Sequence, residues 1–245
     1  MEVHHHAHTS GKKWTHYFWE FLMLFLAVFC GFLAEYQLEH KIEKDREKVY
    51  IKSMIEDLAS DTINLTETIE NFNRRELKID TVLKMYRKLA NGYNDTLRRN
   101  MSALRGFADF IYTDRTMQQL KNSGGMRLIR NKAASDGIVS YDSKVRDHGI
   151  DVVGLEDAFK EVLHLQWEIF DEEDLMLDKQ YKSIEELEKE NKNYLLISDK
   201  PTLGKFNNTI IEFDTMCGFV KKKEQQLKQK AIELIALLKK EYHLK

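Results

Sequence analysis

The chain offers few places where a regular helix would be interrupted. It contains one proline, Pro201, and 11 glycines in 245 residues. Proline removes a main-chain hydrogen-bond donor, and glycine costs conformational entropy when it is ordered. Their scarcity favours long helices over strands and tight turns. We therefore predict an all-α fold.

An apolar run near the N-terminus carries no charged residue from Phe21 to Ala34. Runs of this length also occur in signal peptides and in buried core helices. Here, however, Tyr17 and Tyr36 flank the run, and in a helix they are separated by roughly 30 Å, the thickness of a hydrocarbon core. No small-x-small cleavage site follows. These features predict an uncleaved transmembrane signal anchor over residues 14–38, followed by a helical domain outside the membrane over 39–245.

The charges beside the anchor bear on its orientation. Lys12 and Lys13 precede it, whereas four lysine or arginine residues follow it within 39–48, mixed with acidic residues. A count of basic residues alone favours an external N-terminus. The short N-terminal tail with its lysine pair favours the reverse. We expect a bacterial inner-membrane protein with a cytoplasmic N-terminus and a periplasmic C-terminal domain.

Glu20 is an acidic residue about one helical turn inside the predicted interface. Such a carboxylate can extend back to water at modest cost. Alternatively, it faces other helices, where it fixes their packing or lies on an ion path. His16 precedes it by one turn on the same helix face and is a candidate partner.

Residues 1–13 form a polar tail that contains His4, His5, His6 and His8. A histidine tract of this kind binds Zn²⁺, Ni²⁺ or Cu²⁺ loosely. A defined site needs ligands on rigid elements, and the tail offers none. We therefore expect only a weak metal site there.

From Ile51 onwards, apolar residues recur in alternating steps of four and three, the spacing of one face of a long helix. The positions include Ile51, Ile55, Leu58, Leu65, Ile69, Phe72, Ile79 and Leu83, with Thr62 and Glu76 as the polar exceptions. This pattern predicts a long helix at about 49–93, in a coiled coil or a bundle, with Gly92 as its terminator.

The remaining chain is predicted to be helical as well. Shorter helices are expected over 101–200, at the distal end of the domain. A second long helix is expected over 205–243, where one stripe contains Leu227, Ala231, Leu234 and Leu238. The two long helices should pack antiparallel.

Sequence motifs of common enzymes and cofactor sites are absent: there is no P-loop, dinucleotide-binding loop, H-E-x-x-H or G-x-S-x-G. His148 and His164 have no carboxylate or cysteine at ligand spacing, so we interpret both as structural or surface residues. The acidic run Asp171 to Asp178 lacks the spaced oxygens of an EF-hand. A net charge of −2 does not indicate a nucleic-acid partner. We expect no enzymatic activity and no cofactor.

The segment "LKNSGGMRLIRNK" places Gly124 and Gly125 directly before Arg127 and Arg130. Main-chain N–H groups and arginines in this order can hold an anion. The alternative is a tight turn between helices, in which a glycine adopts positive φ. We favour the turn and keep the anion site as an alternative.

Three stretches together resemble a known family: the anchor "FLMLFLAVFCGFLAEY", the segment "YIKSMIEDLASDT" and the later "MQQLKNSGGMRLIRNK". They are similar to uncharacterised single-pass membrane proteins of Bacteroidota, of the DUF6090 type. The resemblance covers most of the chain and implies one N-terminal span and a helical domain. It matches Glu20 to an early glutamate in the span, and Leu120 to Ile129 to an "L-x-x-S/N-G-x-x-x-L-I" turn. It implies no activity.

These observations favour a structural or interaction module that is held at the lipid bilayer, associates with itself and presents a surface to an envelope protein. One alternative is a channel-like or stator-like oligomer that uses Glu20. Another is a sensor that binds a small anion at the Gly124–Gly125 and Arg127 turn.

Overall fold

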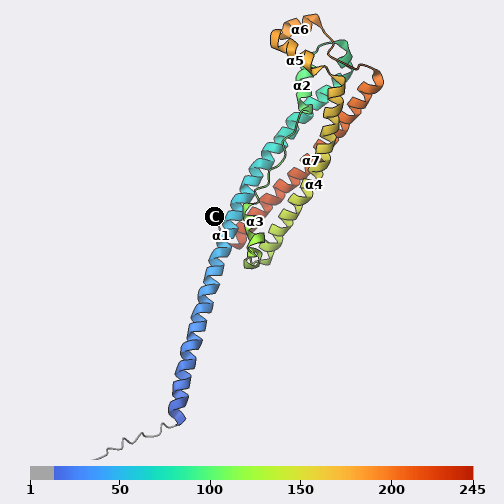
Figure 1. Cartoon of the computed structure of the whole chain (residues 1–245). Helices are drawn as coiled ribbons and strands as arrows, with labels where there is room; N and C mark the ends of the chain where they lie inside the picture. Colours follow the sequence, from blue (N-terminus) through green and yellow to red (C-terminus); the bar gives the residue numbers. More distant parts are fainter. Residues whose placement is uncertain (1–13, 245) are drawn as a thin grey trace, which may run out of the picture. The chain divides into compact units, whose positions relative to one another are not determined.

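The computed structural model describes residues 14–244, and within them it contains helices and no β-strand. The all-α prediction is therefore confirmed. In chain order the elements are α1 (Trp14–Met85), the 3₁₀ helix η1 (Tyr86–Asn91), α2 (Asp95–Met101), η2 (Ser102–Leu104), α3 (Arg115–Asn122), η3 (Gly125–Leu128), α4 (Lys132–Ile169), α5 (Glu172–Tyr181), α6 (Ile184–Glu190) and α7 (Lys200–Glu241) (Figure 1).

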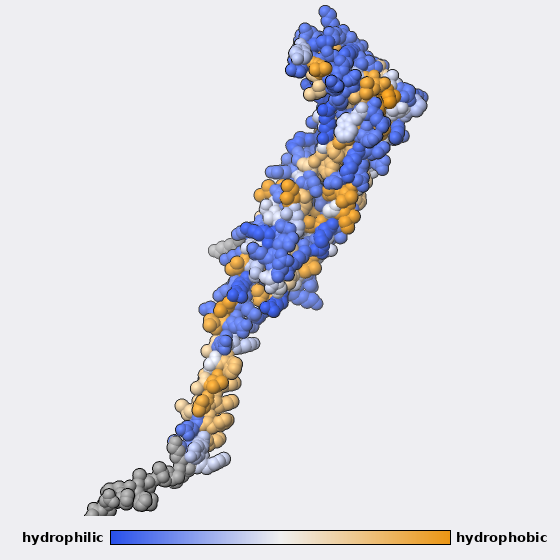
Figure 2. All heavy atoms as spheres, viewed as in Figure 1, coloured by the Kyte–Doolittle hydropathy of each residue, from blue (hydrophilic) through white to orange (hydrophobic). Residues whose placement is uncertain are grey.

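The chain divides into two compact units, residues 1–50 and 51–245, and α1 contributes to both. The described part of the first unit is helical, and nearly all of its side chains are exposed. It includes an 18-residue window with a mean hydropathy of 2.0, none of which is buried. Figure 2 shows apolar side chains along this part of α1. The helix is long and apolar enough to cross a membrane, which is compatible with a single-pass membrane protein.

The second half of α1 places every seventh residue in the interior of the second unit. These residues are Ile51, Leu58, Leu65, Phe72 and Ile79, and each is at most 3% exposed. They follow the predicted apolar seam, and the intervening seam positions are half-buried or exposed. Within the second unit, this chain's own residues therefore cover every seventh position of the seam.

Helices α4 and α7 form the closest helix pair and run side by side (Figure 1). A Cβ atom added at Gly137 of α4 would lie 2.8 Å from the Leu234 side chain of α7, so glycine permits this close approach. The sequence interpretation assigned short helices to 101–200, but α4 spans 38 residues and is a main member of the bundle. Helix α7 begins at Lys200, where Asp199 accepts a hydrogen bond from the main-chain N–H of Thr202.

An extended segment, residues 105–114, runs between α1 and α4. On one side, Asn64 of α1 donates to the Ile111 carbonyl and Asp61 accepts from the Thr113 N–H. On the other side, Phe107 contacts Phe159 of α4, and Tyr112 contacts Tyr141. The segment therefore fills the space between the two helices, as a strip of side chains that no helical pattern marks in the sequence.

The long helix ends earlier than predicted, at Met85, and a 3₁₀ turn follows it to Asn91. Gly92 then adopts a φ of 101°. A Cβ atom there would lie 2.4 Å from the Asn191 carbonyl oxygen, so only glycine fits. Gly92 thus ends the 3₁₀ turn rather than the long α-helix, and it also lets Asn191 approach closely.

Candidate functional site

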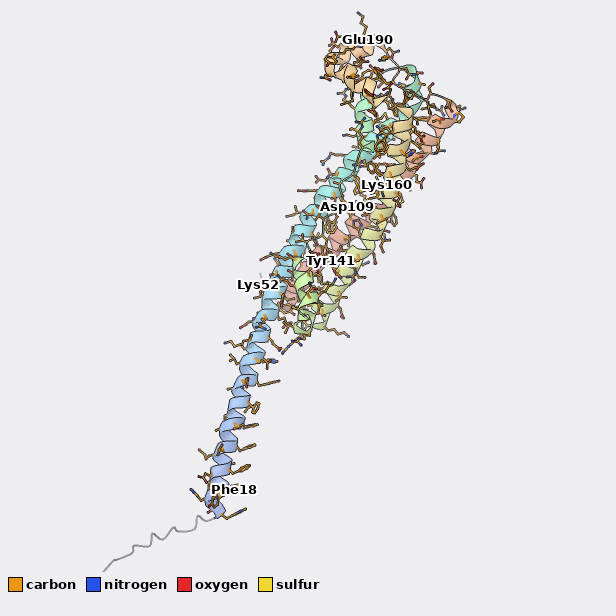
Figure 3. The ribbon with its side chains drawn as sticks, in the orientation of Figure 1. Phe18, Lys52, Asp109, Tyr141, Lys160 and Glu190 are labelled. Carbon is orange, nitrogen blue, oxygen red and sulfur yellow. The ribbon has the colours of Figure 1, made fainter. Side chains whose placement is uncertain are left out.

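Three side chains of metal-ligand type meet inside the bundle. His148 lies on α4, Glu224 on α7 and Asp109 on the extended segment, which Figure 3 labels between the helices. Nε2 of His148 is 3.6 Å from Oδ1 of Asp109 and 3.7 Å from Oε1 of Glu224. One nitrogen and two carboxylate oxygens therefore lie within 4.8 Å of one another.

The side chains of His148 and Glu224 are buried, and their polar atoms lack hydrogen bonds among the described residues. His148 is 4% exposed and Glu224 is 0% exposed. Neither ring nitrogen of His148 and neither carboxylate oxygen of Glu224 has a hydrogen-bond partner among the described residues. Buried polar groups in native proteins are seldom left in this state, and such exceptions often mark functional sites.

Burial determines the electrostatics of Glu224. It raises the pKa of the carboxyl to about 7, although the nearby Thr68 hydroxyl and His148 lower it in part. Oγ1 of Thr68 also lies 3.2 Å from each of the Asn64 and Leu65 carbonyl oxygens of α1. Thr68 therefore borders the Glu224 carboxylate.

A small cavity of about 60 Å³ opens beside His148. Asp147 and Asp151 of α4 line it, together with Lys223 of α7. The volume suffices for water, and the lining is polar. The cluster is thus buried but borders a space that water can enter.

A second buried carboxylate site lies on α1, within the "EDLASDT" stretch. Oδ1 of Asp61 accepts a hydrogen bond from the Thr113 N–H, and Oδ2 accepts one from the Tyr141 hydroxyl, both at 2.8 Å. Asp57 accepts from the Thr116 N–H at 2.8 Å and pairs with Arg115. Asp57 and Asp61 thus bind the end of the extended segment and the start of α3 to α1.

Burial raises the pKa of Asp61, and the hydrogen bonds from Thr113 and Tyr141 offset this in part. Burial also raises the pKa of Tyr141, whose hydroxyl remains a donor. Figure 3 labels Tyr141 at a different level of the bundle from Asp109. We assign this second site a structural role, since each Asp61 oxygen is satisfied within the fold.

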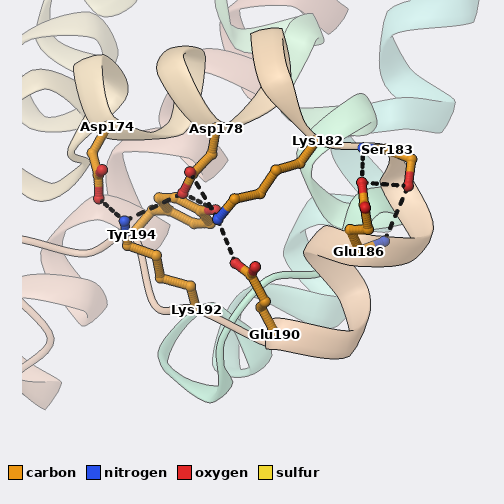
Figure 4. Close-up of polar contacts among 8 residues, drawn as sticks. All are labelled: Asp174, Asp178, Lys182, Ser183, Glu186, Glu190, Lys192 and Tyr194. Carbon is orange, nitrogen blue, oxygen red and sulfur yellow. Dashed lines mark hydrogen bonds and ion pairs between the residues drawn. The ribbon is translucent and has the colours of Figure 1, made fainter.

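The acidic run on α5 is engaged by lysines (Figure 4). Lys192 contacts Asp174 at 2.5 Å and Asp178 at 3.2 Å, while Lys182 contacts Asp178 at 3.0 Å. The Tyr194 hydroxyl also donates to Asp178, and these contacts lower the pKa of that carboxyl to about 2. These contacts form a solvated ion-pair network, in which the Asp178 carboxylate is already paired with the ammonium groups of Lys182 and Lys192.

The site residues expected from sequence lie apart from the buried cluster. His16 and Glu20 are exposed on the first part of α1. Gly124 has a φ of 64°, as a tight turn after α3 requires, and the Arg127 and Arg130 side chains are exposed. His4, His5, His6 and His8 lie outside the described residues.

Sequence reasoning assigned His148 to a structural or surface role and did not identify its partners. A signal was nevertheless present. Glu224 occupies a position in the apolar stripe of α7 between Val220 and Leu227, and His148 lies likewise between Val145 and Val152 on α4. A polar residue at the centre of a four-three apolar stripe is costly to bury and therefore informative.

Comparison of this chain with protein-family models, curated proteins and solved structures gave no match.

Proposed function

We propose that this protein is a single-pass inner-membrane protein whose helical domain acts as a structural or interaction module and associates with itself. In this proposal the N-terminus is cytoplasmic and the domain periplasmic, and the chain has the single N-terminal span and helical domain that its resemblance to DUF6090-type proteins implies. The observation that carries it is the fully exposed apolar window of α1, on the helix that continues into the core of the domain. An exposed surface of this kind needs lipid or protein around it.

The surface for self-association lies outside the α1 seam, because this chain already buries that seam. On the domain, Ile150 and Val153 of α4 and Phe219 of α7 are exposed apolar side chains, which we call the α4–α7 patch. Lys223 of α7 lies over the Phe219 ring and pairs with Asp151 of α4. We assign this α4–α7 patch to the contact with a second copy.

The test is the mass of the detergent-extracted full-length protein, measured by light scattering during size-exclusion chromatography. An oligomer is expected, and Ile150→Lys combined with Phe219→Lys should convert it to monomers. The matched control is Leu77→Lys, which changes an exposed apolar residue of α1.

An oligomer that survives the double substitution would place the contacts in the anchor instead. Glu20→Gln would then separate packing from ion conduction, because only a conducting carboxylate would lose ion flux while the assembly stayed intact. A monomeric wild-type protein would contradict self-association and leave a different envelope protein as the partner.

A further inference from the structure

We propose that Asp109, His148 and Glu224 bind a divalent first-row transition-metal ion, with Zn²⁺ as the representative ion, inside the helical bundle. Its three ligands are different residues from those of the membrane anchor and of the α4–α7 patch. It goes beyond the interaction role proposed above. An ion held there would join the extended segment directly to α4 and α7.

The separations of the ligand atoms are the first support. Nε2 of His148 is 3.6 Å from the Asp109 oxygen and 3.7 Å from the Glu224 oxygen. Both distances exceed the roughly 2.8 Å of a charge-assisted hydrogen bond. Two ligand atoms that are each about 2.1 Å from a tetrahedral Zn²⁺ lie about 3.4 Å apart. His148 is therefore spaced from each carboxylate oxygen like an atom that shares an ion with it, and too widely for a direct hydrogen bond.

Unsatisfied buried atoms supply independent support. His148 and Glu224 are both more than nine-tenths buried, and their four polar side-chain atoms have no hydrogen-bond partner among residues 14–244. Burying such groups unpaired costs free energy. A cation between them would satisfy the carboxylate and one ring nitrogen at once.

The donor set indicates the class of ion. Ca²⁺ and Mg²⁺ take oxygen ligands, whereas one imidazole nitrogen with carboxylate oxygens suits Zn²⁺ and its first-row neighbours. Three protein ligands leave a coordination position for water. The cavity of about 60 Å³ beside His148 is large enough to hold water.

The test is Zn²⁺ binding to the full-length protein in detergent, by isothermal titration with a competing chelator. Because the tail histidines would also take up metal, every variant carries His4, His5, His6 and His8 changed to alanine. We expect about one Zn²⁺ per chain. We expect His148→Gln to weaken binding by at least about 100-fold, since it removes a direct ligand.

His164→Gln is the matched control. His164 lies on the same helix and also neighbours a carboxylate, Glu168, at 3.2 Å, but both side chains are exposed. Its substitution should leave the affinity unchanged. An equal loss in both histidine variants would show that the bound Zn²⁺ is not in the buried cluster and would overturn the proposal.

Glu224→Gln keeps the proposal testable if His148→Gln does not fold, and circular dichroism identifies folded variants. In the folded tail variant, Co²⁺ in place of Zn²⁺ should give visible absorption bands, and Glu224→Gln should lose them. The proposal is overturned if the folded tail variant takes up no Zn²⁺. It is also overturned if folded Glu224→Gln binds Zn²⁺ and Co²⁺ unchanged.

Discussion

Asp61 and Glu224 are both completely buried carboxylates in the same bundle, and they differ in what surrounds them. Each oxygen of Asp61 accepts a hydrogen bond at 2.8 Å, one from the main chain and one from Tyr141. Neither oxygen of Glu224 accepts any among the described residues. Asp61 is thus part of a complete hydrogen-bond network. The oxygens of Glu224, in contrast, remain free to accept a hydrogen bond or to bind a cation.

This difference predicts opposite consequences of removing the two charges. When a fully hydrogen-bonded carboxylate is removed, its buried donors lose their acceptor and the folded state is destabilised. When an unpaired buried carboxylate is removed, the folded state no longer carries the cost of desolvating that charge. Measurements of the free energy of unfolding can therefore distinguish the two sites. The predictions below apply to the full-length protein in detergent without added metal.

The largest effect is expected for Asp61→Ala. It leaves the half-buried Thr113 N–H and the buried Tyr141 hydroxyl without an acceptor, and the free energy of unfolding should fall by about 4 kcal/mol. Denaturant titration followed by circular dichroism measures this. The control is Asp80→Ala, which removes an exposed ion pair with Lys84 and should change stability by less than about 0.5 kcal/mol. Equal effects at both positions would show that Asp61 does not hold the extended segment.

Tyr141→Phe should have a smaller effect of the same sign. It removes only the hydroxyl, leaves one Asp61 oxygen unsatisfied and keeps the ring packing, so a loss of about 2 kcal/mol is expected. Tyr112→Phe is the matched control, because Tyr112 contacts Tyr141 through its ring. Thermal unfolding of the two variants side by side gives the comparison. A neutral Tyr141→Phe would mean that water replaces the hydroxyl at Asp61.

The fold could be predicted from the sequence, whereas the two carboxylate sites could not. The scarcity of helix breakers predicts the all-α fold, and the spacing of Ile51, Leu58 and Leu65 predicts the seam that the bundle buries. Both signals are local, because each depends on residues within a few turns of one helix. The apolar anchor is local in the same sense.

The two carboxylate sites depend on partners from different elements. Asp61 meets Thr113 and Tyr141 only after the extended segment has packed between α1 and α4. Glu224 meets His148 because α4 and α7 pair along their length. No ligand spacing in the sequence encodes such tertiary contacts. The sequence shows that His148 and Glu224 each interrupt an apolar stripe, but it does not show which residues they face.

Glu224→Gln is expected to act in the opposite direction to Asp61→Ala. In the presence of EDTA the substitution removes a desolvated charge that no hydrogen bond supports, and it preserves side-chain volume. Stability should therefore stay constant or rise by about 1 kcal/mol. Chemical denaturation in EDTA measures it, with Glu233→Gln on the exposed face of α7 as the control. A loss comparable to that of Asp61→Ala would show that Glu224 is engaged in the fold, and the contrast between the two sites would disappear.

The smallest effect is a dependence on pH at Asp61. Because burial raises its pKa in the folded state, the contribution of Asp61 to stability is complete below the unfolded pKa of 3.8 and is lost as pH rises through the folded pKa. The asparagine in Asp61→Asn does not titrate. The stability difference between wild type and this variant should therefore shrink as pH rises above about 4.

Denaturant titrations of wild type and Asp61→Asn at several pH values measure this difference, and subtraction cancels titrations that both proteins share. Asp80→Asn, at an exposed position, gives the reference slope. A difference that grows with pH would mean that the two donated hydrogen bonds outweigh burial and lower the pKa of Asp61. Asp61 would then resemble a strongly stabilised carboxylate, and its contrast with Glu224 would be larger than burial alone implies.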